Sequence, residues 1–475
     1  MISYQTIKSI QGPLIFIHNT EKIGYQELVT ITDENGKEIQ GQVIAIEKDI
    51  AVVQVFDNSA GFKINNAQAV FTGETKKISL SPTILGRIFS GSGAPIDNKE
   101  PIQGKEVDVN SLSNQFLSDP LPFKYRDVNG AAINPYRRSE AHDFIQTGIS
   151  SIDSNITIVK GQKIPIFSGS GLPDLEILSQ IATKAKTSDP NDKFVVVVAA
   201  MGISNDQYQY LTNELEKSKA LSRSVMFVNL ASDPVVERIL TPRLALTVSE
   251  YLAYELDFSV LTLMFDLTNY AGAMREISTA KKEIPGRAGY PGYLYTDLAG
   301  LLERAGTIEG KKGSITQIPI LSMPNDDVTH PVPDLTGYIT EGQIVLDRGL
   351  HKQNIFPPIN IAKSLSRLKD KAQGAGVGKT REDHPQVADQ LFASLAESEN
   401  QKELALVLGQ DSLSETGKKY LKFGTEYEKK FLNQGRTSRS INETLDIAWD
   451  LFSILPREEL KKLKDDMVQK YGKSI

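Results

Sequence analysis

The sequence predicts a multidomain α/β protein with three parts in chain order: an N-terminal β-barrel, a central domain on a mostly parallel sheet of the nucleotide-binding type, and a C-terminal helical bundle. Three observations predict this fold class. Short strand-like runs recur about every ten residues over residues 1–75, apolar strands alternate with helices over residues 76–356, and residues 357–475 show helical spacing without strand-like runs. A chain of 475 residues is long enough for a large core divided among these domains.

The first 75 residues contain alternating or apolar runs at 14–17, 28–31, 41–46 and 51–56. Turn signals such as Asp-Glu-Asn-Gly at residues 33–36 separate them. This spacing favours a small closed barrel, which leaves no sheet edge exposed. A solitary β module without a role beyond adhesion is the alternative.

The central region predicts buried strands joined by helices. The expected strands are apolar runs at residues 163–167, 194–200, 224–230, 260–265 and 314–321. The expected helices lie between them, at residues 176–185, 205–217, 234–239 and 246–255. A Gly- and Pro-rich connector at residues 285–292 is expected to form a surface turn or a subunit contact.

The last 119 or so residues are rich in Lys, Glu, Leu and Ala at helical spacing. They predict a bundle of helices at residues 384–398, 400–408, 414–432, 441–452 and 456–471.

Composition excludes several function classes. The net charge of −6, with acids and bases interspersed, argues against a dedicated nucleic-acid binder. The absence of cysteine excludes disulfides and thiol catalysis, and five dispersed histidines predict no metal site. No signal peptide is evident, and the longest apolar run, residues 194–201, is too short to cross a bilayer, so we expect any membrane association to come through partners.

Residues 164–176 have the outline of a phosphate-binding loop. A strand candidate leads into Gly169, Ser170, Gly171 and Leu172, and Pro173 suits the first turn of a helix. In a working Gly-x-x-x-x-Gly-Lys-Ser/Thr loop, backbone N–H groups hold the phosphates, the lysine reaches the outer phosphates and the hydroxyl holds magnesium.

The last three positions of that pattern hold Asp174, Leu175 and Glu176, so the lysine is missing. Two carboxylates at the positive end of a helix repel a polyphosphate. We therefore expect a loop that keeps its shape without its chemistry, while weak binding through backbone groups stays open.

Asp266 follows the apolar run 260–265, as does the aspartate that positions magnesium in nucleotide-binding α/β domains. Capping of the next helix is an equal alternative for this residue. The first acid after the run 194–200 is Asp206, inside a helical stretch, so no residue is placed to orient an attacking water.

A second glycine-rich segment, residues 374–380, ends in Gly-Lys-Thr. Its first pattern position is Gln373, and the polar stretch 364–371 precedes it where a buried strand is required. We interpret this segment as a flexible glycine turn.

Arg367 follows Pro-Pro-Ile-Asn at residues 357–360 and the serines Ser364 and Ser366. An arginine on a polar segment is commonly a solvated surface charge. The functional alternative is an arginine finger, a planar and permanently charged group that one subunit places against the γ-phosphate held by its neighbour.

Several stretches, in this order, resemble the non-catalytic B subunit of V-type/A-type rotary ion-translocating ATPases. They are residues 144–153, 167–173, 285–295, 313–320, 334–343, 357–360, 364–367 and 379–384. Catalytic A subunits of these complexes carry an intact lysine loop and a long insertion, and this sequence has neither.

The resemblance implies a β-barrel crown, a RecA-like central domain and a C-terminal helical domain. It implies a ring of three A and three B subunits around a rotor stalk, with residues 285–291 facing that shaft. Arg367 takes the arginine-finger position, supported by Ser364 and Ser366. ATP or ADP with magnesium is then held mainly by the A subunit, and none is bound tightly by this chain.

The same resemblance implies a cytoplasmic protein, peripheral on the membrane through its complex. Its further partners are peripheral-stalk subunits and, indirectly, a membrane ring that moves H⁺ or Na⁺. The sequence departs from the family pattern at residues 134–143, at Asp174 and Leu175, and in the longer turn 373–378. Two other function classes stay open: a self-sufficient ring ATPase of the secretion or RNA-translocase type, and a nucleotide-sensing module.

Overall fold

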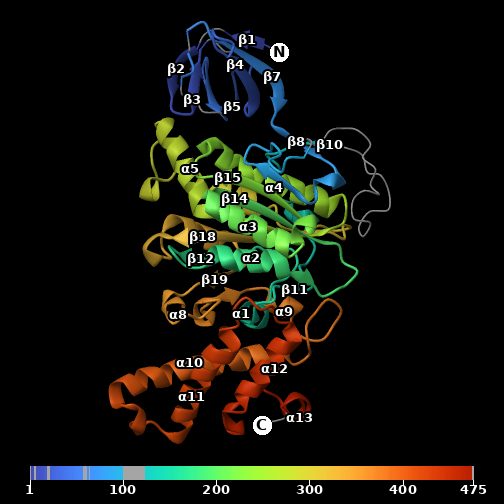
Figure 1. The fold of residues 1–475 in the computed structure, drawn as a ribbon, viewed down its shortest axis with the longest axis vertical. Coiled ribbons are helices and arrows are strands. Elements are labelled where there is room, and N and C mark those ends of the chain that lie inside the picture. The colour runs from blue at the N-terminus through green and yellow to red at the C-terminus, as the bar shows by residue number, and fades with distance from the viewer. Residues whose placement is uncertain are drawn as a thin grey trace.

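The computed structural model describes residues 2–4, 7–18, 22–56, 61–63, 65–99 and 124–472. Figure 1 shows three tiers along the long axis, with the N-terminal sheet at one end, the α/β domain in the middle and the C-terminal helices at the other end. This order agrees with the fold class that the sequence predicts. The domain boundaries after residues 75 and 356 stay a prediction.

The N-terminal tier is a seven-stranded antiparallel sheet in the order β1-β7-β4-β5-β6-β3-β2. Its strands are β1 (Ile2–Tyr4), β2 (Ile7–Gln11), β3 (Leu14–Ile17), β4 (Glu27–Thr32), β5 (Glu38–Glu47), β6 (Ile50–Val55) and β7 (Gln68–Thr75). β1 and β2 lie at opposite edges of this order, yet Tyr4 and Ile7 are joined by a chain that spans no more than about 11 Å. The sheet is therefore curled, with its two edges near each other.

The central tier is built on a sheet in the order β20-β19-β12-β18-β16-β14-β15-β9. Its strands are β9 (Arg87–Ser90), β12 (Ile166–Gly169), β14 (Phe194–Ile203), β15 (Ser224–Leu230), β16 (Ser259–Phe265), β18 (Ser314–Met323), β19 (Gly342–Val345) and β20 (Leu365–Ser366). Neighbouring strands are parallel from β9 to β19, and β20 joins the edge antiparallel. β17 (Gly306–Thr307) pairs with β18, while β8 (Lys77–Leu80) with β10 (Lys124–Asp127) and β11 (Ile145–Gln146) with β13 (Lys186–Thr187) form separate pairs.

Helices cover both faces of this sheet. They are α1 (Ser150–Asn155), α2 (Asp174–Lys184), α3 (Asn205–Lys217), α4 (Val235–Tyr254), α5 (Leu267–Ala280), α6 (Leu294–Leu302) and α7 (Pro331–Ile339). Two short helices, α8 (Arg348–Lys352) and α9 (Lys369–Ala372), follow in the chain. Alternate residues of β14 face opposite cores: Val197 packs with α4 to α7, and Val198 packs with α1 to α3. Burial on both faces explains the unbroken apolar run that predicted this strand.

The structure corrects the sequence at α4. The sequence predicts separate helices at residues 234–239 and 246–255, but one helix runs through Pro242. The proline removes a backbone donor, while Leu240 and Leu244 on either side of it are buried against the sheet. This packing keeps the helix continuous at Pro242, where the sequence predicts a break.

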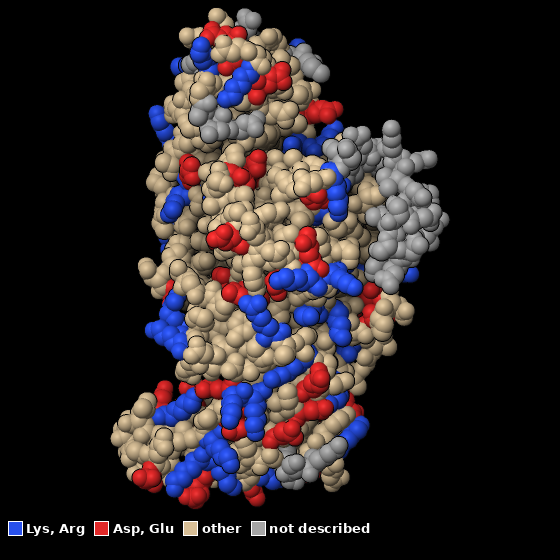
Figure 2. All heavy atoms as spheres, in the orientation of Figure 1, with Lys and Arg blue, Asp and Glu red and all other residues tan. Residues whose placement is uncertain are grey.

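The C-terminal tier contains α10 (His384–Leu408), α11 (Glu415–Glu426) continued by a π-helix (Tyr427–Leu432), α12 (Ile441–Phe452) and α13 (Asp465–Tyr471). These helices share a core that includes Phe423, Phe431 and Phe452. Among the described residues, no helix combines the length and the apolar character needed to cross a membrane. On the face drawn in Figure 2, acidic and basic side chains are interspersed, most densely over this tier.

Three expected C-terminal helices differ from the structure. The stretches 384–398 and 400–408 form one helix, with side-chain pairs Gln401–Glu397 and Lys402–Glu399 across the expected break. In the expected helix 456–471, only α13 and a 3₁₀ turn, Arg457–Glu459, are helical. The backbone N–H groups of Lys462 and Lys464 donate instead to glutamine side chains of α10, which holds this segment out of a helix.

Candidate functional site

The predicted loop has the strand–loop–helix geometry of a phosphate loop. β12 ends at Gly169, Leu172 N donates to Gly169 O at 3.1 Å, and α2 begins at Asp174. Gly171 has φ +78°, a left-handed conformation that favours glycine. The loop therefore has the shape that the sequence predicts.

The position of the missing lysine is closed to a charged group. Leu175, which stands there, is buried with 8% exposure. Its backbone N–H donates to Asp174 Oδ1 at 2.8 Å, so a carboxylate accepts from the helix terminus that a phosphate would use. Burial is the main cause that raises the pKa of Asp174, and the nearby Glu176 raises it further.

An ion pair packs against the loop. Arg348 donates from Nε to Asp326 Oδ2 at 2.7 Å and from Nη2 to Asp326 Oδ1 at 2.8 Å. Arg348 Nη2 also donates to Ser170 O at 3.0 Å. A Cβ on Gly169 would lie 2.0 Å from Asp326 Oδ1, so this pair covers the glycine directly.

Asp266 caps a helix. It has φ +63°, and its Oδ1 accepts from Asn269 N, at the start of α5, at 2.9 Å. Burial, the largest cause, raises the pKa of Asp266 to about 6, and the negative charge of Asp174 raises it further. The capping alternative is therefore observed, and the magnesium role stays a prediction.

These residues do not fit a magnesium nucleotide held by this chain alone. The cation at the lysine position is replaced by a buried leucine, a carboxylate accepts from the helix terminus, and Arg348 is neutralised by Asp326. A polyphosphate entering at this helix terminus would meet Asp174 and Glu176, and the arginine that contacts the loop backbone is already paired with Asp326.

Arg367 lies at the other end of the sheet. It follows β20, where Ser366 pairs with Gly342 at the start of β19, and its backbone N–H donates to Glu341 O at 2.9 Å. Its side chain is exposed. Among the described residues, the guanidinium makes no hydrogen bond or ion pair with another side chain.

The two neighbouring serines have structural partners. Ser364 Oγ donates to Asn360 O at 2.6 Å and accepts from Val345 N at 2.9 Å, which ties its segment to β19. Ser366 Oγ accepts from Gln162 Nε2 at 2.9 Å and from Leu368 N at 3.4 Å. Both hydroxyls therefore fix the backbone that carries Arg367.

The structure does not bring Arg367 to the glycine loop. Phe167 of β12 pairs with Val345, so Gly169 lies about five residues along the strand direction from Gly342, which is roughly 16 Å. The loop lies at the carboxyl ends of the parallel strands, and Arg367 lies at their amino ends. Arg367 is thus remote from the loop of its own chain.

The second glycine-rich segment is a turn, as predicted. α9 precedes it rather than a strand, and residues 374–378 form bends and a turn. Thr380 Oγ1 accepts from Gly374 N at 3.1 Å and contacts His384 Nδ1 at 2.8 Å. Lys379 therefore has no strand–loop–helix context.

Sequence reasoning missed Asp326 and Arg348, although a signal was present. They follow β18 and β19, the two strands that flank β12, at their carboxyl ends, where ligands bind in open parallel sheets. Gln162, Lys163 and Glu341, which surround the base of Arg367, were also missed. A single Gln, Lys or Glu in a sequence does not indicate which distant residue its side chain contacts.

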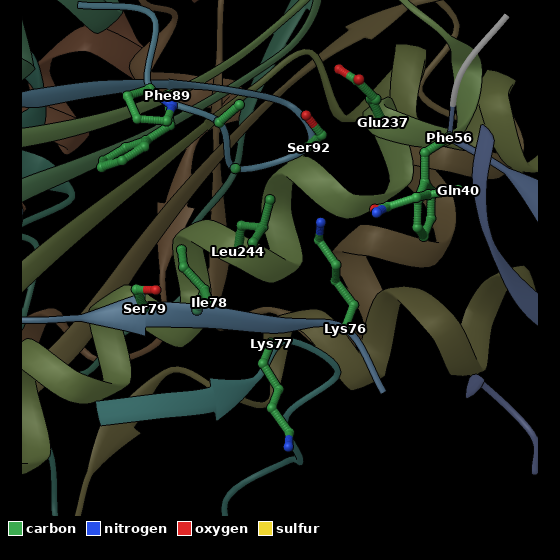
Figure 3. Close-up of a pocket in the computed structure, with 13 residues that line it drawn as sticks. Gln40, Phe56, Lys76, Lys77, Ile78, Ser79, Phe89, Ser92, Glu237 and Leu244 are labelled. Carbon is green, nitrogen blue, oxygen red and sulfur yellow. The ribbon is translucent and has the colours of Figure 1, made fainter. Parts of the chain in front are cut away.

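A separate hollow lies between the N-terminal sheet and the central domain. This cavity of about 370 Å³ is lined by residues that include Gln40, Phe56, Lys76, Glu237 and Leu244 (Figure 3). In the close-up, the side chains of Lys76, just before β8, and Lys77, its first residue, point to opposite sides of the chain. Neither the glycine loop nor Arg367 lines this cavity, so it is not part of the predicted site.

Comparisons with known proteins agree with this architecture. Residues 7–73 match the β-barrel domain of the ATP synthase alpha/beta family, and residues 148–366 match its nucleotide-binding domain. Residues 373–472 match the C-terminal domain of V and A type ATP synthase.

A solved structure, an ATP synthase subunit called NeqB from Nanoarcheaum equitans, is similar over almost the whole length. It shares 40% sequence identity, covers 93% of this chain and 98% of its own, and superposes with a TM-score of 0.70. With three family domains in the same order and this relative, the chain belongs to the ATP synthase alpha/beta family and carries a C-terminal domain of the V and A type.

Proposed function

We propose that this chain is the non-catalytic B-type subunit of a V/A-type rotary ATPase and that it acts in trans. It alternates with catalytic A subunits in a ring of three and three. Arg367 acts as an arginine finger on the ATP held by a neighbouring A subunit. The observation that carries the proposal is the position of Arg367, exposed and without a side-chain ion partner among the described residues, at the opposite end of the sheet from its own loop.

The chemistry of the finger follows from its charge and shape. Negative charge spreads over the γ-phosphate oxygens during phosphoryl transfer, and a planar guanidinium can donate two parallel hydrogen bonds to it. Such a residue contributes about 10³ to 10⁵ in rate, or about 4 to 7 kcal/mol of the barrier. The backbone anchors at Glu341 and Ser366 support this role because they limit the freedom of the residue before it meets its target.

The degenerate loop supports the non-catalytic half of the proposal. Leu175, Asp174 and the Asp326–Arg348 pair leave no place for a tightly held polyphosphate. Under this proposal, Gly169, Ser170, Gly171, Leu172 and Asp266 keep a family shape that at most binds nucleotide weakly. ATP or ADP with magnesium is held mainly by the partner.

The remaining partners follow from membership of such a complex. They are the central rotor stalk, which the loop at residues 285–291 faces, and peripheral-stalk subunits. A membrane ring moves H⁺ or Na⁺, so ATP hydrolysis or synthesis is coupled to ion transport. The chain is then cytoplasmic and peripheral on the membrane through its complex.

Two rival functions make different demands. A self-sufficient ring ATPase of the secretion or RNA-translocase type needs its own lysine and water-orienting acid. A nucleotide sensor needs tight binding by the isolated chain. The buried Leu175 opposes the first, and the acidic loop opposes the second.

ATP hydrolysis by the purified chain, alone and assembled with a catalytic A subunit, tests the proposal. We expect no turnover from the chain alone and magnesium-dependent turnover on assembly. A parallel titration of the isolated chain with labelled ATP is expected to show only weak binding. Robust hydrolysis by the chain alone would favour the self-sufficient ATPase, and tight magnesium-dependent binding without hydrolysis would favour the sensor.

A further inference from the structure

We infer that Gln162 is a positioning residue for Arg367: its side-chain amide holds the strand that carries the finger. The inference rests on the proposed function of Arg367. It assigns a role to a residue that neither touches the nucleotide nor lies near Arg367 in sequence.

β20 is a two-residue edge strand, Leu365–Ser366, paired antiparallel with β19. A pairing this short contains few backbone hydrogen bonds, and Arg367 is the first residue after it. The register of β20 needs a further anchor if Arg367 is to keep one position.

Gln162 lies across the seam between the two strands. It is fully buried, and its Nε2 donates to Ser366 Oγ at 2.9 Å and to Glu341 O at 3.4 Å. Ser366 directly precedes Arg367, and Glu341 O accepts from Arg367 N at 2.9 Å. Both N–H groups of the Gln162 side-chain amide therefore donate to Ser366 and Glu341, the two residues that hold the backbone of Arg367.

The amide is itself held in one orientation. Gln162 Oε1 accepts from Val159 N at 3.0 Å, and Gln162 N donates to Val159 O at 3.1 Å, so a tight turn before β12 fixes both ends of the residue. Gln162 O also accepts from Gln317 N of β18 at 2.9 Å. The anchor of Arg367 thus comes from the centre of the sheet rather than from its edge.

The next residue, Lys163, binds the side-chain carboxylate of Glu341. Lys163 Nζ pairs with Glu341 Oε1 at 2.8 Å, and Lys163 N donates to Glu341 Oε2 at 2.8 Å. Both oxygens of Glu341 are therefore occupied, although its backbone contacts Arg367. The guanidinium stays available for an incoming phosphate.

The chain contains a matched control for this contact. Gln390 of α10 is 2% exposed, and its Nε2 donates to Ser394 Oγ at 2.9 Å and to Glu459 O at 3.3 Å. Its Oε1 accepts from Lys462 N at 2.9 Å. The same set of partners occurs at both glutamines, but Gln390 lies in the C-terminal helices and has no link to Arg367.

The test is a double-mutant cycle in the complex reconstituted with a catalytic A subunit. Gln162→Met and Gln390→Met keep the side-chain volume and remove the same three hydrogen bonds. We expect similar falls in melting temperature. Only Gln162→Met should lower kcat for ATP, by about 100-fold for a displacement near 1 Å, with KM nearly unchanged.

Combination with Arg367→Ala separates positioning from general damage. If Gln162 acts through Arg367, Gln162→Met lowers kcat in the wild-type background and has no further effect in the Arg367→Ala background. An equal loss in both backgrounds, or the same loss from Gln390→Met, would overturn the inference while leaving the proposed function intact. Unchanged turnover of Arg367→Ala itself would overturn the proposed function and the inference together.

A second variant covers a failure of Gln162→Met to fold. Ser366→Ala removes the hydroxyl that accepts from Gln162 Nε2 and leaves Gln162 hydrogen-bonded to Glu341 O. We expect the same loss of kcat that disappears in the Arg367→Ala background. Normal turnover of Ser366→Ala would contradict the role of this contact.

Discussion

Arg348 and Asp326 form a two-point ion pair, 2.7 and 2.8 Å long, over Gly169 of the degenerate loop. The residues are separated by 22 positions and follow β18 and β19, the two strands that flank β12 in the sheet. The only cation that touches the loop backbone, among the residues that the structure describes, is thus neutralised within the chain.

Because of this pair, restoring the missing lysine is not expected to restore nucleotide binding. In Leu175→Lys the new ammonium enters a buried site beside Asp174, so we expect a loss of about 1 to 3 kcal/mol in the free energy of unfolding. Titration of the isolated variant with labelled ATP should still show only weak binding. Leu175→Met is the matched control for packing, and tight magnesium-dependent binding by Leu175→Lys would contradict the account.

The raised pKa of Asp266 predicts that the stability of the chain depends on pH. The pKa of Asp266 is raised to about 6 in the folded chain, from an ordinary value of 3.8. The folded state then binds more protons than the unfolded state between these values, so the contribution of this group is present below pH about 4 and is lost as the pH rises to about 6. Asp266→Asn keeps a helix cap and removes the titrating group. In chemical unfolding measured across that pH range, we expect the free energy of unfolding of this variant to fall by up to about 3 kcal/mol less than that of the wild type.

His384 predicts a slope of the opposite sign. It is fully buried, with Nε2 against Ser154 O at 2.7 Å, and burial lowers its pKa to about 4. The unfolded state therefore binds more protons between pH about 4 and 6.5, and stability is lost as the pH falls through this window. Unfolding of His384→Gln, which cannot titrate, should depend less on pH on the acid side. A variant as acid-sensitive as the wild type would show that another group causes the effect.

Gly342 tests the register of the strand that carries Arg367. It has φ +145°, and a Cβ there would lie 2.2 Å from Leu365 O. Gly342→Ala should push β20 away from β19 and lower kcat of the assembled complex by about 100-fold. Gly337→Ala is the control, because its Cβ would meet only Phe167 Cζ at 4.0 Å, and it should keep normal turnover. Equal activity of the two variants would contradict the importance of this register.

The sequence could predict most of the central sheet, because strands buried on both faces produce unbroken apolar runs, as residues 194–203 do. It could not predict the continuity of α4, since the penalty of Pro242 is local while the packing that overrides it is tertiary. The sequence also predicts a helix over the C-terminal segment 460–464, and this prediction fails because of tertiary contacts. The backbone of this segment donates to side chains of α10 that lie more than 70 residues away in sequence.

The candidate site divides in the same way. The shape of the glycine loop and the place of Asp266 at a strand end could be predicted, because a strand, a turn and a helix follow each other locally, while their binding roles stay a prediction. The Asp326–Arg348 pair and the amide of Gln162 depend on which strands are neighbours in the sheet. That order is set by packing across the whole domain, so residue types and spacing alone did not reveal these contacts.

The central claim is that Arg367 acts on a phosphate held by another subunit. The most direct measurement is steady-state ATP hydrolysis by the complex with a catalytic A subunit, assembled with the wild-type chain, Arg367→Ala or Arg367→Lys. We predict that Arg367→Ala lowers kcat by about 10³ or more, that lysine restores little because it lacks the planar fork, and that added guanidinium ion partly rescues the alanine variant. Full assembly of the Arg367→Ala complex with turnover close to that of the wild type would contradict the account.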